Sequence, residues 1–278
     1  IYHFSRDSHL ASLLEMKAQI KDQIKKIGHI LLSKKVGKRQ DLPLDNWYIR
    51  YIDHRLTLHN QSLKKLAEQY KTPLHIVDLE KLKDNFEGFS KAVSKSGLNC
   101  EVFLSYKTNP IPWMLSYLHE YGAGAEVISE YELELALTLG VPGKKIIYNG
   151  PAKSNESIAL AISEEILMLN INHFEEISRV RRIASDLGKK VNVGLRIVNQ
   201  DAWAGQLGIP TNGGQALKAF RELLEIPEFN VVGVHCHRGV LFRNKEDIRI
   251  HANHILGFCA DLKNELNYIP QIIDFGGS

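Results

Sequence analysis

From residue 101 onward, short apolar runs alternate with longer stretches whose apolar residues recur at helical spacing. The helical stretches include 131–140, 174–188, 214–224 and 248–266. The apolar runs that we expect to form strands are 101–107, 125–129, 145–150, 166–171, 191–197, 230–237 and 271–277. Strands and helices that alternate in this way predict βα units around a parallel sheet.

Seven βα units in series predict an α/β fold of the (β/α)8 TIM-barrel type, which needs an eighth unit to close. A doubly wound sheet is the alternative, but no G-x-G-x-x-G turn follows the first strand. The sequence stops directly after the seventh predicted strand. Because an uncovered sheet edge is unfavourable in a soluble protein, we expect the native chain to continue beyond this point.

The barrel is expected to occupy residues 73–278, with a short strand and an amphipathic helix before the strand at 101–107. Residues 1–72 are expected to form a helical, basic extension, because residues 1–40 carry nine Lys or Arg against three Asp or Glu. Ile20, Ile24, Ile27 and Leu31 there have helical spacing, and "RQDLP" is a candidate linker. Binding to nucleic acid or a membrane surface is one interpretation, and packing of the apolar stripe on the protein body is the favoured one.

Successive side chains of a strand point to opposite faces, which predicts the residues that line the barrel interior. The residues expected to face the interior are Phe103, Ser105, Lys107, Asn192, Gly194, Arg196, Gly233, His235 and His237. The residues expected to face the helices are Val102, Leu104, Tyr106, Val191, Val193, Leu195, Val232, Val234 and Cys236. Three strands therefore direct a basic or imidazole side chain inward near their carboxyl ends, where barrel enzymes build their sites.

A lysine is costly to bury at the end of a strand, so Lys107 needs a chemical reason to be there. A lysine amine beside other cations is a nucleophile that forms Schiff bases with carbonyl compounds. The carbonyl could belong to a sugar, as in aldolases, or to pyridoxal phosphate. Gly276 and Gly277 favour the cofactor, because glycines let backbone N–H groups approach a phosphate closely.

Several motifs occur in an order and spacing that resemble a known family. They are "PLHIVDLEKL", "SYKTNP", "GAGAEVISEYELELAL", "IIYNGPAKS", "GVHCHRG" and "IDFGG". Over about residues 70–278 the chain resembles the fold-type III pyridoxal-phosphate-dependent decarboxylases, which include diaminopimelate, ornithine and arginine decarboxylases. The resemblance implies an alanine racemase-like barrel followed by a C-terminal β-sheet domain, which is missing from this sequence.

The resemblance also implies roles for individual residues. Lys107 matches the lysine that holds the cofactor as a Schiff base, and His237 matches the histidine stacked on its ring. Gly276 and Gly277 match the phosphate-binding loop. Arg196 matches an arginine close to the ring, and Glu126 takes the place of an acidic residue near the cofactor. Ser129 and Glu132 fall in the family's S-x-x-E positions, where Glu132 could equally cap a helix.

This sequence departs from the family at residue 240, where Val240 stands in place of a serine that faces the phosphate. The resemblance implies decarboxylation of a basic or diamino acid such as diaminopimelate, in a homodimer. A non-catalytic regulatory homologue and an amino-acid racemase of the same fold type remain alternatives.

Composition changes this picture little. With 44% hydrophobic and 24% charged residues the chain is ordinary and globular, and a net charge of +3 is too small to imply a nucleic-acid partner. Cys100, Cys236 and Cys259 stand far apart, which fits a reducing cytoplasm, and no apolar run reaches the length of a membrane span. His251 and His254 could be a metal pair, but a solvated helix face is the favoured interpretation and no metal is expected.

Overall fold

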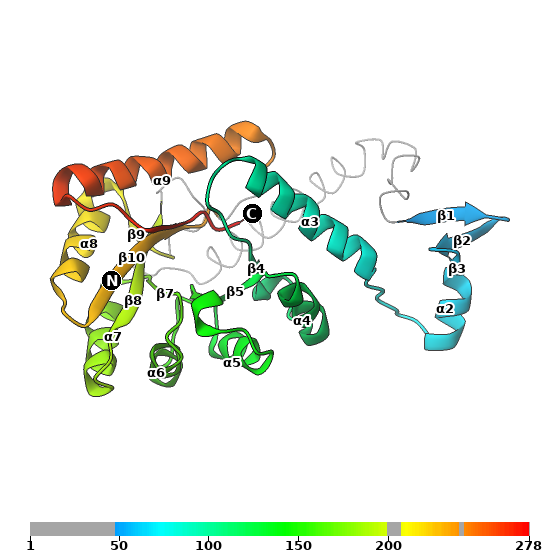
Figure 1. Cartoon of the computed structure of the whole chain (residues 1–278), viewed down its shortest axis with the longest axis horizontal. Coiled ribbons are helices and arrows are strands. Elements are labelled where there is room, and N and C mark those ends of the chain that lie inside the picture. The colour runs from blue at the N-terminus through cyan, green and yellow to red at the C-terminus, as the bar shows by residue number, and fades with distance from the viewer. Residues whose placement is uncertain (1–47, 199–206, 239–241, 278) are drawn as a thin grey trace, which may run out of the picture. The chain divides into compact units, whose positions relative to one another are not determined.

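The computed structural model describes residues 48–198, 207–238 and 242–277 (Figure 1). The chain separates into two compact units, Ile1–Leu82 and Lys83–Ser278. The predicted amphipathic stretch at 20–31 and the candidate linker "RQDLP" lie outside the described residues.

The described part of the first unit contains strands as well as a helix. Its strands β1 (Ile49–Ile52), β2 (Arg55–Leu58) and β3 (Gln61–Ser62) form an antiparallel sheet, and α2 (Leu63–Tyr70) follows. Asp53–His54 and His59–Asn60 all have positive φ, which is the geometry of tight two-residue hairpin turns. Residues 74–78 have no regular secondary structure, so the short strand expected before the first amphipathic helix does not form.

The second unit is built on a parallel sheet whose order is β11-β10-β8-β7-β6-β5-β4, with β9 paired to β8. All seven strands predicted from the sequence are present, which confirms the incomplete barrel. Their bounds are β4 Phe103–Ser105, β5 Gly124–Val127, β6 Ile146–Tyr148, β7 Met168–Ile171, β8 Val191–Val198, β10 Phe229–Cys236 and β11 Ile272–Asp274, and β9 is Ile209–Pro210.

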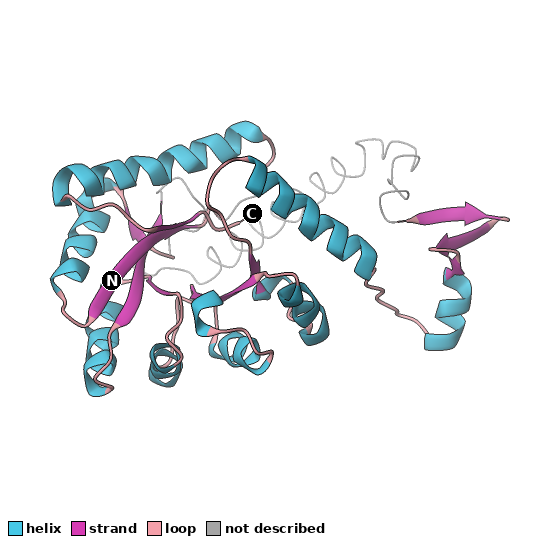
Figure 2. Cartoon of the chain, viewed as in Figure 1, coloured by secondary structure: helices cyan, strands magenta, loops and turns pink. Residues whose placement is uncertain are grey.

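Helices separate these strands, as the sequence predicted (Figure 2). The helix α3 begins at Leu79, in the first unit, and ends at Lys95. The others are α4 Pro112–Glu120, α5 Glu130–Thr138, α6 Asn155–Ser163, α7 Phe174–Asp186, α8 Gln215–Glu225 and α9 Lys245–Leu266. No helix of the described residues combines the length and apolar content needed to cross a membrane.

Two apolar clusters cover the two faces of the sheet. The large one joins the sheet to the helices and contains Tyr106, Val193, Leu195, Val234 and Cys236, as the alternation predicted. The small one consists of Ile147, Met168 and Val232, with Phe103 and Ile272 against it. The large cluster, on the helix side of the sheet, is the outer cluster, and the small one, on the barrel side, is the inner cluster.

Val232 was expected to face the helices, and this prediction is wrong. The register between β10 and its neighbour β8 shifts between Val231 and Gly233. This irregularity inserts one residue into the alternation, so Val231 joins the outer cluster and Val232 joins the inner one.

Candidate active site

The carboxyl edge of the sheet gathers the residues that the sequence singled out. Lys107 follows β4, Glu126 lies in β5, Arg196 in β8, and His237 directly after β10. Gly276 and Gly277 follow β11, the neighbour of β10. Because all of these strands are parallel, their carboxyl ends lie at the same edge of the sheet.

Lys107 is not part of a strand and is not buried, which corrects the sequence-based expectation. The strand ends at Ser105, and Lys107 lies in the 3₁₀ helix η3 (Tyr106–Thr108) with an exposed side chain. The turn is held by its first residue, because the hydroxyl of fully buried Tyr106 lies 2.7 Å from His119 Nε2. His119 Nδ1 donates to the Ala123 carbonyl at 2.8 Å, so Nε2 is left to accept from Tyr106.

Glu126 is joined to the strands on either side of β5. One carboxylate oxygen accepts a hydrogen bond from the Ser105 hydroxyl on β4. The other accepts from the side-chain amide of Asn149, beyond β6, at 3.0 Å. The carboxylate is therefore fixed one strand away from the turn that carries Lys107.

Ser129 caps the helix α5, and Glu132 in its first turn bonds back to the residue before the cap. The Ser129 hydroxyl accepts from Glu132 N–H at 3.3 Å, and Glu132 Oε2 accepts from Ile128 N–H at 2.7 Å. Burial raises the pKa of Glu132; the bond from Ile128 lowers it, the charge of Glu126 raises it and that of Lys107 lowers it. The net direction is upward, so this carboxyl binds its proton more readily than an exposed glutamate does.

Arg196 points into the barrel and is 5% exposed. Its Nη1 donates to the Asn149 carbonyl at 3.4 Å, whereas its buried Nε–H has no partner among the described residues. Burial lowers the pKa of Arg196, and the carboxylate of Glu126 opposes this shift. An arginine guanidinium keeps its charge even when burial lowers its pKa. The site therefore contains a buried cation whose Nε–H donor is unused.

His237 lies against the glycine turn. Its Nδ1 accepts a hydrogen bond from Gly277 N–H at 3.2 Å. Burial and, secondarily, the charges of Lys107, His235 and Arg196 lower the pKa of His237 to about 4. The ring is therefore neutral at pH 7, with Nδ1 as acceptor.

The glycine turn requires glycine at its first position. Gly276 has φ +62°, and a Cβ atom there would lie 2.8 Å from the Cys236 carbonyl oxygen. The Gly276 N–H donates to Asp274 Oδ1 at 2.8 Å. Both N–H groups of the pair, Gly276 and Gly277, are thus engaged within the chain, to Asp274 and His237.

Asp274 is a site residue that the sequence reasoning missed. It faces the interior from β11, and its Oδ2 lies 2.9 Å from His235 Nδ1, an ion-pair contact without the alignment of a hydrogen bond. Burial would raise the pKa of Asp274, but the charge of His235, together with hydrogen bonds from Gly276 and Asn149, lowers it to about 2. The alternation within "QIID" would have placed Asp274 on the same face as Ile272, which is inside.

Two asparagines, Asn149 and Asn170, join the site and were not singled out from the sequence. The polar layer is the set of side chains that they form with Glu126, Arg196 and Asp274. Asn149 Nδ2 donates to Glu126 and, at 3.4 Å, to Asp274 Oδ2. The Asn170 amide donates to Asn149 Oδ1. The single polar residue inside the apolar run "ILMLNI" was the available indication for Asn170.

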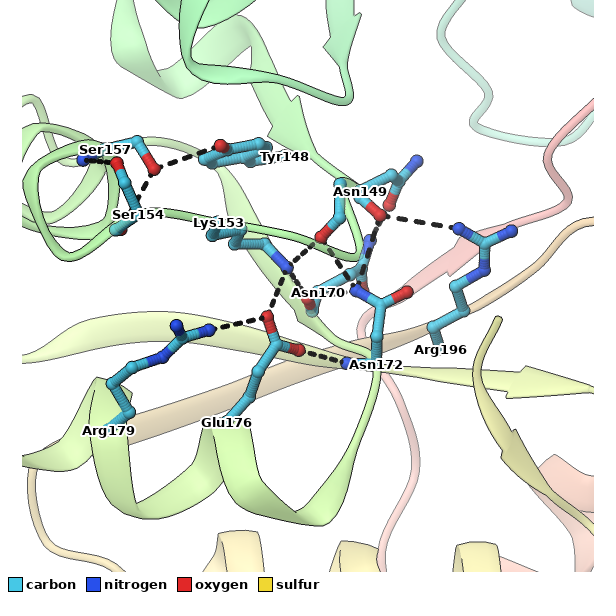
Figure 3. Close-up of polar contacts among 11 residues, drawn as sticks. Tyr148, Asn149, Lys153, Ser154, Ser157, Asn170, Asn172, Glu176, Arg179 and Arg196 are labelled. Carbon is cyan, nitrogen blue, oxygen red and sulfur yellow. Dashed lines mark hydrogen bonds and ion pairs between the residues drawn. The ribbon is translucent and has the colours of Figure 1, made fainter. Parts of the chain in front are cut away.

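A buried lysine lies beside Asn170 (Figure 3). Lys153, in the loop after β6, is 2% exposed and pairs with Glu176 of α7 at 3.0 Å. Its ammonium also donates to the backbone carbonyls of Gly150 and Asn170. No periodic pattern covers this loop, so alternation could not have predicted the contact.

His251 corrects another expectation. It is 5% exposed, and its Nε2 donates to the Phe275 carbonyl at 2.8 Å. The prediction of a solvated histidine face on α9 is therefore wrong at this residue. Val240 lies outside the described residues, so its placement relative to the site stays a sequence-based expectation.

Comparison with known proteins identifies the family. Residues 79–278 match the family model described as "Pyridoxal-dependent decarboxylase, pyridoxal binding domain". The chain belongs to this family. The match begins at α3 and includes every strand of the parallel sheet.

Similar members of the pyridoxal-dependent decarboxylase family are diaminopimelate decarboxylases. That of Methanocaldococcus jannaschii is 30% identical over 84% of this chain, and that of Aquifex aeolicus is 32% identical over 84%. These alignments cover 57% and 56% of the two relatives, so the chain spans little more than half their length. A crystal structure of the Methanocaldococcus jannaschii enzyme "in co-complex with L-lysine" superposes with a TM-score of 0.75 and 29% identity, covering 81% of this chain and 55% of that one.

The described residues fit pyridoxal phosphate, the cofactor of this family domain. Lys107 supplies an exposed amine at the carboxyl edge. His237 supplies a neutral ring, and Arg196 supplies a buried guanidinium whose Nε–H is unused. An unpaired buried donor is costly unless something polar approaches it, so Arg196 favours a polar occupant of the interior.

Proposed function

We propose that this chain carries the cofactor site of a pyridoxal-phosphate-dependent amino-acid decarboxylase whose substrate is a basic or diamino acid resembling diaminopimelate. The observation that carries the proposal is the position of Lys107, exposed at the carboxyl edge of the sheet within the matched pyridoxal-binding domain, where its charge helps to lower the pKa of His237. The names of the relatives support the substrate class, because they are diaminopimelate decarboxylases and one was crystallised with L-lysine.

Each proposed role follows from placement and chemistry. Lys107 would hold the cofactor covalently through Nζ, and the neutral ring of His237 would lie against it. Gly276 and Gly277 would offer backbone N–H groups to the phosphate, which requires them to exchange their present bonds to Asp274 and His237.

Arg196 and Glu126 would set the charge around the ring. The buried guanidinium and the fixed carboxylate come from β8 and β5. When bound, the cofactor supplies an electron sink for the electron pair left by the departing carboxylate. The chain supplies orientation and electrostatics, and the Lys107 amine, once free, can take up or donate a proton at Nζ.

A homodimer in a reducing cytoplasm is part of the same proposal. Lys107, Gly276 and Gly277 are exposed, whereas chemistry of this kind is favoured where water is excluded. A partner subunit is the proposed cover, as the family resemblance implies. The free thiols of Cys100, Cys236 and Cys259 support a reducing compartment, because disulfides are rare there.

The first experiment is the visible absorption spectrum of the purified chain with pyridoxal phosphate. We expect a band from the lysine-linked cofactor, reducible by borohydride, and its loss in Lys107→Ala. Lys145→Ala is the matched control, because Lys145 is a partly exposed lysine that pairs with Glu101 away from the carboxyl edge.

Carbon dioxide release would then be measured with diaminopimelate, ornithine, arginine and lysine. Release from one of these in the parent and not in Lys107→Ala supports the decarboxylase. A band without release from any of them would favour the non-catalytic homologue. Absence of the band in the parent would reject the cofactor site itself.

A further inference from the structure

Lys153 is buried more completely than any function described above requires. Its side chain is 0% exposed, as is expected of very few lysines, because burying an ammonium is costly. Burial lowers the pKa of Lys153 to about 8, against the opposing influence of Glu176. The family resemblance and the proposed chemistry give this residue no role.

The ammonium uses its three donors on three different segments. It donates to the Gly150 carbonyl after β6 at 2.5 Å, to the Asn170 carbonyl in β7 at 2.8 Å, and to Glu176 Oε1 in α7 at 3.0 Å. Figure 3 shows the Lys153 nitrogen close to Asn170 and Glu176. A lysine ammonium has three N–H donors and no acceptor, so this arrangement satisfies it fully.

The carbonyls that Lys153 binds belong to the backbone that carries the polar layer. Gly150 directly follows Asn149, and Asn170 is itself a member of the layer. The side chains of Asn149 and Asn170 reach from there to each other and to the interior carboxylates. The Asn149 carbonyl also accepts from Arg196.

Glu176 reinforces the same segment from the other side. Its Oε2 accepts from Asn172 N–H at 2.6 Å, and the Asn172 amide donates to the Gly150 carbonyl at 3.1 Å. Arg179 approaches Glu176 Oε1 at 3.6 Å. The carboxylate therefore anchors the end of β7 while its partner Lys153 anchors the loop after β6.

We infer that Lys153 is a positioning residue of the cofactor site, holding the ends of β6 and β7 so that Asn149 and Asn170 stay aimed at Glu126, Asp274 and Arg196. The inference rests on the proposed function for the identity of the ligand. It does not rest on stability, because a buried ion pair often adds no more than an apolar pair of the same volume.

The test separates the ion pair from the carbonyl bonds. In Lys153→Met the buried carboxylate of Glu176 loses its nearer charged partner and keeps Arg179 at 3.6 Å, which destabilises the fold. Lys153→Met/Glu176→Gln removes that charge and keeps an oxygen that can accept from Asn172 N–H. In both variants the carbonyls of Gly150 and Asn170 have lost their lysine donor.

Two measurements are made on the full chain and on both variants. The first is hydrogen exchange of the peptides covering 149–154 and 170–173 without cofactor. The second is the dissociation constant of pyridoxal phosphate, from the absorption titration. Val180→Ala is the control, because Val180 is buried in the outer cluster on α7 and its truncation destabilises the fold without touching these carbonyls.

We expect the double variant to recover thermal stability relative to Lys153→Met while its two peptides still exchange faster than in the parent. We expect its cofactor affinity to stay about tenfold or more below that of the parent, a loss that one well-placed polar contact accounts for. Val180→Ala should lose stability and keep its cofactor affinity within about twofold, as expected of a substitution outside the site.

Recovery of affinity together with stability in the double variant would overturn the inference, since Lys153 would then serve folding alone. Unchanged exchange of the two peptides in the cofactor-free chain would overturn it as well, independently of any ligand. Failure of the proposed function is distinguishable, because it would show as absent cofactor binding in the parent chain. That result would remove the site that Lys153 is inferred to position.

Discussion

Burial and neighbouring charges together set the protonation state of single residues at the interior of the barrel. Asp274 shows this most clearly, because burial acts to raise its pKa and the surrounding donors outweigh it. His237 shows the reverse outcome, since burial and neighbouring cations both disfavour its charged form. The glycine pair Gly276–Gly277 is therefore bonded both to a carboxylate that keeps its charge, Asp274, and to a ring that stays neutral, His237.

Asp274→Asn tests the carboxylate. The pKa of Asp274 falls from 3.8 to about 2 in the folded chain, so its ionised form stabilises the fold at pH 7. A shift of this size corresponds to about 2 kcal/mol of unfolding free energy, which is fully present above pH ~4 and is lost as pH falls from ~4 to ~2. Urea unfolding should show the parent ahead of Asp274→Asn by about that amount at pH 7, with the difference shrinking below pH ~4.

Asp261→Asn is the control, because Asp261 is an exposed aspartate on α9. Its effect should stay within about 0.5 kcal/mol at every pH, as is usual for surface substitutions. A difference between the parent and Asp274→Asn that does not change between pH 7 and pH 3 would show that the charge of Asp274 is not the stabilising feature.

At the level of strands and helices, the sequence was informative wherever a periodic pattern continued without interruption. The seven parallel strands and the outward or inward orientation along β8 followed from alternation alone. Alternation failed at Val232, where an inserted residue reverses it, and at Lys107, where the strand gives way to a 3₁₀ turn. Lys153 could not be predicted, because its contacts join a loop to residues 17 and 23 positions away.

Gly194 in β8 faces the interior of the barrel, where there is no space for a Cβ atom. A Cβ atom there would lie 2.5 Å from Met168 Sδ and closer still to Asn170 Oδ1. In contrast, a Cβ atom at Gly257 in α9 would meet nothing within 4 Å apart from its chain neighbours and the nearby backbone of its own helix. The two glycines therefore form a matched pair for one substitution.

Gly194→Ala should destabilise the chain by about 1–3 kcal/mol, because overpacking forces the neighbouring side chains to shift. Gly257→Ala should stabilise it by about 0.5–1 kcal/mol, because alanine is the better helix former. Chemical denaturation of both variants measures the two values. Equal effects of the same sign would contradict the packing of the interior.

At the scale of the whole molecule, the sheet places the site residues at one edge, with Lys107, Gly276 and Gly277 exposed. Exposure of this kind leaves the three residues in contact with water, which would weaken electrostatic interactions in the proposed site. Asn149, Asn170 and Arg196 of the polar layer are buried, so the barrel itself excludes water from one side only. The proposed partner subunit would exclude it from the other.

Association of two chains has a measurable thermodynamic consequence. If the folded state is a dimer and the unfolded state is not, mass action favours the folded state as the protein concentration rises. The melting temperature should then rise by about 1 °C for each tenfold increase in protein concentration, given the entropy of unfolding of two chains of this length.

Sedimentation equilibrium provides the direct measurement, and a mass of twice the 31.5 kDa of the chain is expected at micromolar concentration. Removal of lysine-linked cofactor by hydroxylamine should slow as dimer forms, because a covered site admits the reagent less readily. Lys107→Ala serves as the control for sedimentation, since loss of the covalent link should leave the mass unchanged. The dimer would be contradicted by a chain that stays monomeric at every concentration and loses its cofactor at one constant rate. The exposed carboxyl edge of the barrel would then be in direct contact with water.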